Sequence, residues 1–476
     1  MKKNLVYDIN DKPVFSKLIV FAIQQLLAIM AATIAVPAIV GNGMSASAAL
    51  FGAGVGTIVY QLFTKFRSPV FLGSSFAFIG SMTAAFAGGV SAGLGYLGLL
   101  IGALFAGLVY VVIAAVVRFV GVGWINKLMP AAVIGPTVAL IGLSLAGAAV
   151  KDVFSYGPVN ADGAFIMSTK LWISFICAMV TFVVVVLCST YGKKMTKLIP
   201  FIIGVMAGYA VALVFTAIGY GTGVDDLKVI DFEPFKALVA DGVNLSTFFA
   251  VPDFAFIKDF GAIKEFEVGY LATIAVAYIP VAFVVFAQYL ATLFVAYVPV
   301  AFVVFAEHIA DHKNLSSIIE SDLLEDPGLH RTLLGDGVGS VAGAIFGGCP
   351  NTTYGESVGC IAITRNASVA TITTTAIMAI LISFVSPFVA FLDSIPGCVM
   401  GGVCVTLYGF IAVSGLKMIQ KIDLEDHANL FTVSVILISG VGGMSMAIGK
   451  VTLTAIACAL ILGIIVNILL NKFKKN

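Results

Sequence analysis

Long uncharged stretches alternate with short polar ones along almost the whole chain. Stretches this apolar, with about 20 residues available per crossing, predict membrane-spanning helices. Glycine-rich sequences near 41–47 and 88–95 divide the two longest stretches into two spans each. About fourteen spans are predicted in this way, at 18–64 and 68–117 (two each), 128–150, 171–192, 198–224, 268–306, 337–349, 350–364, 366–392, 394–416, 428–449 and 451–471.

The composition supports this pattern. The 476 residues are 60% hydrophobic and 11% charged, with a mean hydropathy of +1.09. A water-soluble protein cannot bury so much apolar surface. The net charge of +1 provides no basic surface for a nucleic acid. The sequence therefore predicts an all-α polytopic membrane protein whose surroundings are the lipid bilayer.

Loop charges predict how the chain is oriented. If the predicted spans alternate, most loop lysines and arginines fall on one side, Lys417 and Lys421 among them. Because basic loops face the cytoplasm, both termini are expected there, in a multi-pass protein of the cell membrane. The polar stretch 225–267 is expected to be a long external loop.

One segment of helix length occurs twice in tandem. Residues 270–287 and 289–306 match at 15 of 18 positions. If both copies crossed the membrane, the later basic loops would face outward, against the charge pattern. We therefore expect one crossing, made by the second copy because it leads directly into Glu307. Whether the first copy adds a crossing stays open, as does whether the repeat is natural or engineered.

Two carboxylates stand at the ends of otherwise uncharged stretches. Glu307 follows 268–306 and Glu356 follows 337–355. An ionisable group in such a setting is costly to bury and by default marks a transport or proton pathway. Asp311, four residues after Glu307, shares its helix face. A structural hydrogen bond is the alternative role for Glu307.

Two apolar segments interrupted by proline occupy corresponding places in the two halves. In the first half a proline precedes Ser74-Ser75-Phe76, and in the second another precedes Thr352-Thr353-Tyr354. Such interruptions indicate discontinuous helices that point their N-termini at a substrate near the middle of the membrane. Glu356 would then lie near a half-helix N-terminus, where N–H groups and the dipole favour negative charge. Two ordinary kinked helices are the alternative.

The side chains of these segments favour a flat, neutral heterocycle as the substrate. They offer carboxylates, hydroxyls, backbone N–H groups and aromatic rings, but no lysine or arginine for an anion. A carboxylate can accept a hydrogen bond from a ring N–H, a backbone N–H can donate to a ring carbonyl, and an aromatic side chain can stack.

Other residues carry plainer expectations. The glycine-rich sequence at 335–339 opens an apolar span, so close helix packing is expected there and not phosphate binding. His312, His330 and His427 fall in charged sequences, beside or within loops such as that predicted at 313–331, and are expected to be solvated. No metal-ligand spacing or nucleophile–base arrangement stands out, so neither a metal site nor an enzyme is expected.

With these residues the chain resembles the nucleobase–ascorbate transporter family, and within it the bacterial uracil permease branch. The resemblance spans nearly the whole length. The motifs that carry it are Phe-Leu-Gly-Ser-Ser-Phe-Ala-Phe at 71–78, Ala-Glu-His at 306–308, Asp-Pro-Gly-Leu-His-Arg at 326–331, Pro-Asn-Thr-Thr-Tyr-Gly-Glu at 350–356, and the signature at 356–365 that ends in Thr-Arg.

The resemblance implies a fold of about fourteen segments in two inverted repeats. Short antiparallel strands in the third and tenth segments would meet at the site, and a core domain would move against a gate domain. The core would comprise 1–124 and 268–392, the gate 125–224 and 393–476, with the external loop 225–267 between them.

The resemblance also implies a proton-coupled uracil importer that works by alternating access. No cofactor is implied besides the proton as coupling ion. The expected partners are a nucleobase, the bilayer and, as an open alternative, a second copy in a homodimer. The residues carried over by position are Glu307 and Glu356 as ligands of the ring, Phe76 and Gly355 as backbone contacts, Ser75 and Tyr354 as further lining residues, and Glu307, Asp311 and Gln25 for proton coupling.

Departures from the family pattern keep alternatives open. Asp311 and Gln25 stand where the uracil branch often has histidine, and Ser357 replaces the usual asparagine. Because purine-handling relatives often have aspartate at the position of Asp311, a xanthine or urate transporter is the second hypothesis. If the first copy of the repeat took the native place, Gln288 would replace Glu307 and proton coupling would fail. An anion exchanger or channel and a folded but inactive protein are the remaining hypotheses.

Overall fold

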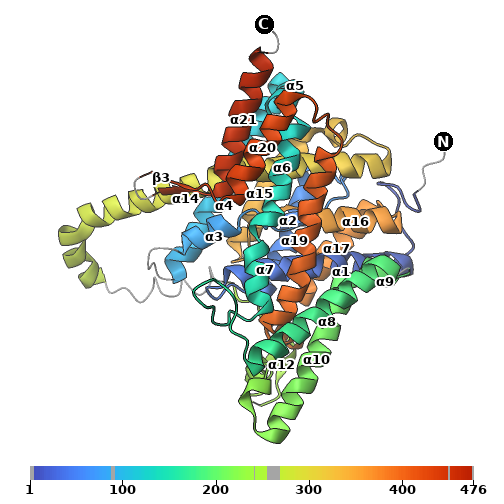
Figure 1. Cartoon of the computed structure of the whole chain (residues 1–476), viewed down its shortest axis with the longest axis vertical. Helices are drawn as coiled ribbons and strands as arrows, with labels where there is room; N and C mark the ends of the chain where they lie inside the picture. The colour runs from blue at the N-terminus through green and yellow to red at the C-terminus, as the bar shows by residue number, and fades with distance from the viewer. Residues whose placement is uncertain are drawn as a thin grey trace.

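A computed structural model describes residues 5–86, 92–193, 195–240, 242–254, 268–448 and 451–473, and this part of the chain is mostly helical (Figure 1). In the first half the helices are α1 (Phe15–Val40), α2 (Ala46–Phe63), α3 (Ile79–Ala85), α4 (Ala92–Val120), α5 (Gly123–Leu128), α6 (Ala131–Ser144), α7 (Ala146–Val153), α8 (Thr169–Tyr191), α9 (Met195–Leu198), α10 (Pro200–Thr222), η1 (Asp225–Leu227), α11 (Glu233–Ala237) and α12 (Leu245–Phe248). In the second half they are α14 (Val268–Ile319), η2 (Leu324–Gly328), α15 (Leu329–Ile345), α16 (Gly355–Thr364), α17 (Val369–Ile382), α18 (Ser386–Asp393), α19 (Gly397–Ile419), α20 (His427–Val441) and α21 (Ala455–Phe473). The strands are β1 (Leu72–Ser74), β2 (Asn351–Thr353), β3 (Met446–Ile448) and β4 (Val451–Leu453).

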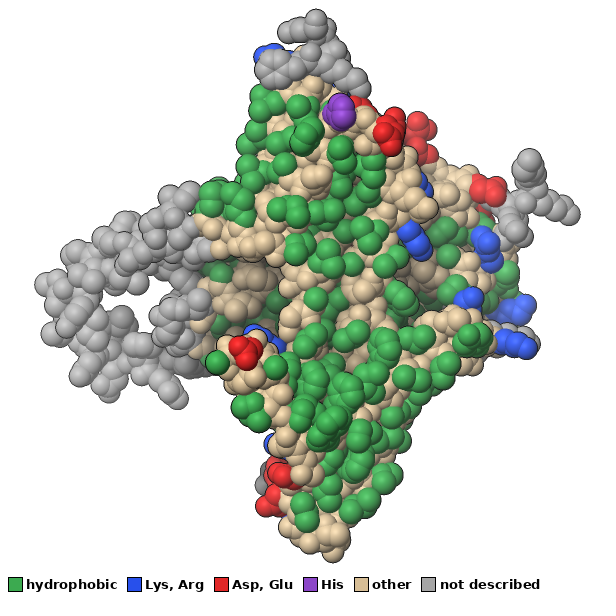
Figure 2. All heavy atoms as spheres, in the orientation of Figure 1, with side chains coloured by type: hydrophobic (Ala, Val, Ile, Leu, Met, Phe, Trp, Pro, Cys, Tyr) green, Lys and Arg blue, Asp and Glu red, His purple; other side chains and the backbone are tan. Residues whose placement is uncertain are grey.

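The outer surface is that of a membrane protein. Within the described residues, nine helices are long and apolar enough to cross a bilayer, and α17 and α20 are shorter apolar helices. Figure 2 shows hydrophobic side chains spread over the helices, with charged ones gathered toward the ends and edges of the molecule. Trp172 on α8 and Val214 on α10 are 54% and 59% exposed. Lipid tails, unlike water, can cover such a surface without cost.

The helices pack in two groups. The first group contains α1, α2, α4, α14, α15 and α17, and the second contains α6, α7, α8, α10, α19, α20 and α21. In the second group α6 and α19 run side by side (Figure 1). In the first group α2 and α15 approach each other closely at glycines: a Cβ added to Gly52 would lie 2.6 Å from the Gly343 oxygen, and one added to Gly56 would lie 2.7 Å from that of Gly339. The close packing predicted for 335–339 is therefore confirmed.

A two-stranded antiparallel ladder joins the two halves of the chain. Strand β1 pairs with β2 in the register Leu72 with Thr353 and Ser74 with Asn351, as expected for the third and tenth segments. The hydroxyl of Thr57 accepts from the Leu72 N–H at 2.9 Å. The amide of Asn351 donates to the Gly52 oxygen at 2.9 Å. Extended backbone inside a membrane must be satisfied in this way by protein.

The second copy of the tandem repeat lies in the core. From Leu293 onward its side chains are described, and Tyr297, Phe305 and Ala306 are fully or almost fully buried. The side chains of the first copy, 270–287, lie outside the described residues. The charged loop predicted at 313–331 is shorter than expected, because α14 continues to Ile319 and α15 begins at Leu329. Buried Leu315 and Ile319 extend the apolar face of α14 into that sequence.

The chain also differs from the prediction near the C-terminus. The span predicted at 428–449 ends as a helix at Val441, and strands β3 and β4 form an antiparallel pair before α21 begins. Gly443, with φ of +70°, stands at the turn that follows α20, a conformation that glycine adopts without strain. The stretch 225–254, expected to be a loop, contains the short helices η1, α11 and α12.

Candidate functional site

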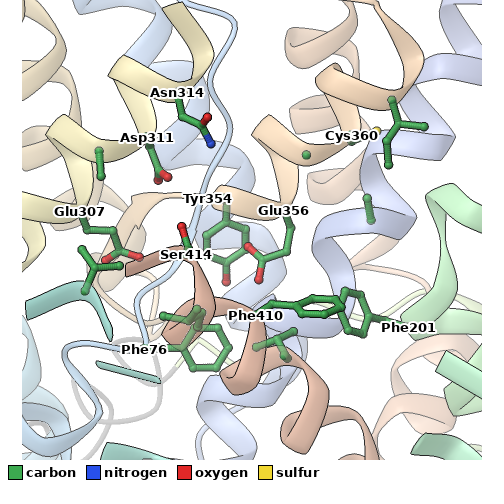
Figure 3. Close-up of a pocket in the computed structure, with 18 of the residues that line it drawn as sticks. Phe76, Phe201, Glu307, Asp311, Asn314, Tyr354, Glu356, Cys360, Phe410 and Ser414 are labelled. Carbon is green, nitrogen blue, oxygen red and sulfur yellow. The ribbon is translucent and has the colours of Figure 1, made fainter. Parts of the chain in front are cut away.

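A cavity of about 340 Å³ lies between the two groups of helices (Figure 3). One wall comes from α14, β2 and α16, together with Phe76, which follows β1. The facing wall comes from α6, α8, α9, α10 and α19. A site bounded in this way changes shape whenever one helix group moves against the other.

The acidic wall is formed by one face of α14. Glu307, Asp311 and Asn314 line the cavity from successive turns (Figure 3). Their spacing of four and three residues places them on one helix face. Both carboxylates are half-buried. The Thr353 hydroxyl donates to Asp311 Oδ2 at 2.8 Å, which ties α14 to β2.

The half-helix α16 supplies the second acidic group. Glu356 lies in its first turn, directly after Gly355, which lines the cavity with no side chain of its own. Tyr354 precedes the helix, and its hydroxyl donates to the Ser74 oxygen at 2.8 Å. In Figure 3 Tyr354 lies between Glu307 and Glu356. A helix N-terminus favours negative charge and offers free N–H donors.

The facing wall is mainly apolar and aromatic. Phe201 of α10 and Phe410 of α19 lie beside Glu356 (Figure 3), with ring centroids 6.0 Å apart. Ser414 of α19 and Lys197 of α9 also line the cavity. Aromatic faces beside acids and N–H donors suit a flat ring that carries both donors and acceptors.

The cavity lining contains six of the eight predicted site residues, namely Phe76, Glu307, Asp311, Tyr354, Gly355 and Glu356. Ser75 does not line it; this residue is fully buried and its N–H donates to the Pro350 oxygen at 3.0 Å. Gln25 does not line it either; its amide donates to the Ser357 hydroxyl. The roles assigned to these residues remain predictions.

The sequence prediction missed most of the facing wall. Phe201, Phe410 and Ser414 lie in uniformly apolar helices, where nothing in the sequence separates a cavity residue from a lipid contact. Asn314 could have been predicted as a lining residue, since it continues the helical spacing of Glu307 and Asp311.

One histidine was predicted wrongly. His312 was expected to be solvated, but it is fully buried. Its Nδ1 bonds the His308 oxygen at 2.8 Å, and its Nε2 lies 2.8 Å from the Tyr60 hydroxyl. The charged neighbours Asp311 and Lys313 favoured an exposed position in the sequence, but the face of α14 that carries His312 packs against the first helix group.

Paired strands that lead into a half-helix beside a cavity, between two helix groups, are typical of membrane transporters. Solved transporters share this fold. The chain is similar to the transmembrane domain of the cyanobacterial bicarbonate transporter BicA, with a TM-score of 0.59 and 13% identity, over 97% of this chain and 100% of that one. It is also similar to the murine Slc26a9 anion transporter in the inward-facing state, with a TM-score of 0.58 and 13% identity, over 98% and 69% of the two chains.

Sequence comparison gives the family. Residues 16–449 match the family model described as "Permease family", and the chain belongs to this family. The uracil permease of Bacillus subtilis (strain 168) is 36% identical over 100% of this chain and 97% of its own length. That of Escherichia coli (strain K12) is 33% identical over 96% and 92% of the two chains. The chain is therefore a multi-pass membrane transporter and not an enzyme.

Proposed function

We propose that the protein imports uracil together with protons by alternating access. Full-length relatives named uracil permeases support the substrate. The observation that carries the proposal is the position of Glu356, in the first turn of α16 and facing a cavity with aromatic walls. There a carboxylate can accept from a ring N–H while N–H groups of the half-helix donate to a ring carbonyl.

The two helix groups act as the moving parts in this proposal. The group with α14, β1, β2 and α16 is the core, formed by 1–124 and 268–392, and the group with α6 and α19 is the gate, formed by 125–224 and 393–476. About fourteen segments in two inverted repeats would build both parts. Rocking of one part against the other would expose the cavity to each side of the membrane in turn.

The cavity faces the cytoplasm in the proposed orientation. Lys197, Asn314 and Ser414 are polar lining residues that are exposed and lie near the ends of their helices. Lys313 and Lys417 lie at the same helix ends and are also exposed. By the charge rule this side is cytoplasmic, and both termini belong there as well.

Proton coupling is assigned to the acids of α14. Glu307 and Asp311 border the cavity half-buried, and an acid in such a setting is less costly in its protonated form than as an unpaired charge. The proton on Glu307 would accompany uracil, with Asp311, held by Thr353, as the next acid toward the exposed end. Gln25 contacts Ser357 of α16 and would affect coupling only through that half-helix.

Replacement of Glu356 with alanine tests the proposal. The change removes a charge-assisted hydrogen bond worth about 1.5–3 kcal/mol, so uracil should bind about 10- to 150-fold more weakly. Uracil binding to the purified protein measures this directly. Unchanged affinity for uracil would contradict the assignment of the site.

A second candidate, a xanthine or urate transporter, rests on Asp311. An additional carboxylate at the cavity wall could accept from the second ring of a purine. Competition of xanthine against labelled uracil separates the two: we expect uracil to be displaced by unlabelled uracil and not by an equal concentration of xanthine.

An anion transporter is the less favoured third candidate. The solved neighbours of the same fold include anion transporters, and Lys197 lines the cavity. The acids Glu307, Asp311 and Glu356, on the wall facing Lys197, would repel an anion. Chloride- or sulfate-driven flux in liposomes would favour this candidate over uracil transport.

A further inference from the structure

Helix α14 carries two acid–histidine pairs, one turn apart. Glu307 is followed by His308, and Asp311 is followed by His312. The acids line the cavity, whereas both histidines are fully buried away from it. Adjacent residues of a helix point about 100° apart, so each pair places one side chain in the site and the next in the packed core.

Both histidine rings are fixed by side chains from other helices. His308 Nδ1 lies 2.6 Å from Asp336 Oδ2, and His308 Nε2 lies 3.0 Å from the Thr332 hydroxyl, both on α15. His312 Nε2 lies 2.8 Å from the Tyr60 hydroxyl of α2. The two rings also stack, with centroids 4.1 Å apart.

The hydrogen-bond donors determine where the protons sit on His308. The Thr332 hydroxyl donates to the Leu329 oxygen at 3.0 Å, so the proton between Thr332 and His308 must be on Nε2. Nδ1 then either accepts a hydrogen bond from a protonated Asp336, or it carries the second proton of the ring and faces an ionised Asp336. In both cases the two side chains together have no net charge.

The surroundings of Asp336 favour the protonated acid. Asp336 is fully buried, and its Oδ1 finds no hydrogen-bond donor among the residues that the structure describes. An ionised carboxylate would leave charge on this unpaired oxygen inside the core, which costs far more than leaving a neutral carbonyl oxygen there. Asp336 therefore donates its proton to His308 Nδ1.

We propose that His308 and Asp336, as a neutral acid–imidazole pair, are positioning residues that hold α14 in the rotation that directs Glu307 into the substrate cavity. The ring is fixed at two points to α15, so α14 cannot turn about its axis without breaking both bonds. His312 and Tyr60 do the same for Asp311 one turn later. This inference rests on the proposed function only for what Glu307 does in the cavity.

The direct test measures the orientation of residue 307 without uracil. Glu307→Cys is made in a Cys360→Ala background, because Cys360 also lines the cavity, and its rate of reaction with a small water-soluble thiol reagent is recorded. Adding Asp336→Leu, which removes the donor to Nδ1, should lower the rate about tenfold or more. An unchanged rate would overturn the proposal.

The conservative variant tests the neutral state of the pair. Asp336→Asn offers an N–H donor to Nδ1 and no charge, so the labelling rate should stay within about threefold of the parent, against about tenfold for Asp336→Leu. In the protein with native Glu307, uracil affinity should follow the same order. If Asp336→Asn is as damaging as Asp336→Leu, the pair is ionic and the proposal is wrong.

Two further measurements keep the proposal open to refutation. Ser340→Ala, on the same helix α15 and one turn beyond Asp336, is the matched control and should change neither readout. If Asp336→Leu does not fold, infrared spectroscopy of the parent against Asp336→Asn decides: loss of a protonated carboxylic acid C=O band supports the proposal, and its absence from the parent contradicts it. Failure of the wild-type protein to bind uracil would contradict the proposed function but leave the labelling result intact.

Discussion

Glu307 and Glu356 differ in how they can act at the cavity, although both line it. Glu356 stands at a helix N-terminus, where N–H donors and the dipole stabilise its negative charge. Glu307 lies in the interior of α14, more than three turns before its last residue, Ile319. In the proposed mechanism the former therefore suits the role of a charged ligand and the latter that of a proton carrier.

Replacement of Glu307 with glutamine should separate binding from coupling. The amide oxygen can still accept from a ring N–H, so uracil affinity should fall by less than about tenfold. The amide cannot carry a proton, so a proton gradient should no longer concentrate uracil in proteoliposomes, while exchange of uracil continues. Uphill accumulation by the variant would refute the coupling role.

At the scale of elements, the short β1–β2 ladder depends on the helices around it. The side-chain amide of Asn351 in β2 donates to the Gly52 oxygen of α2. Helix α2 in turn approaches α15 at glycines. The position of the strands, and with them of Tyr354 and α16, is therefore set by how closely α2 and α15 pack.

Gly56→Ala should disturb this packing. The added Cβ would lie 2.3 Å from Asn351 Nδ2 and 2.7 Å from the Gly339 oxygen, so we expect a loss of about 1–3 kcal/mol in stability and weaker uracil binding. Thermal unfolding in detergent and uracil titration measure both. Gly409→Ala on α19, where a Cβ would meet nothing within 4 Å, is the control and should be neutral or stabilising.

At the scale of the whole molecule, the tandem repeat raises the question of which copy serves the site. The described part of the second copy is packed in the core and continues directly into Glu307 and Asp311. Either copy could supply a helix of nearly the same composition, but only the second is followed by glutamate. The first is followed by Gln288.

Two deletions of equal length separate the copies. Removal of 270–288 leaves the second copy and Glu307, and removal of 289–307 leaves the first copy with Gln288 joined to His308. We expect the first variant to bind and accumulate uracil and the second to bind it without proton-driven accumulation. Loss of uracil binding in the first variant would show that the first copy is needed for the site.

The orientation of the second half is tested at Lys417. This residue is exposed at the end of α19 and is expected on the cytoplasmic side. A Lys417→Cys variant should react with an impermeant thiol reagent in inside-out vesicles and not in intact cells; Lys151→Cys should do the reverse. Reaction of Lys417→Cys in intact cells would mean that the second half is inverted.

The membrane environment, the acids of the site and the half-helix segments could all be predicted from the amino-acid sequence. Uncharged stretches, isolated carboxylates and proline-interrupted segments are local patterns, and each has a local physical cause: the cost of placing charge or unpaired backbone in lipid. For that reason Glu307, Asp311, Glu356 and Tyr354 could be found before their positions were known.

Which apolar residues face the cavity, and which polar residues are buried, became clear from the packing of the helices. Phe201, Phe410 and His312 became assignable once the two helix groups were placed. The same holds for the bond between His308 and Asp336, which lie 28 positions apart in the chain. In lipid-exposed helices hydrophobicity does not distinguish inside from outside, so packing between helices, and not periodicity along one of them, determines these positions.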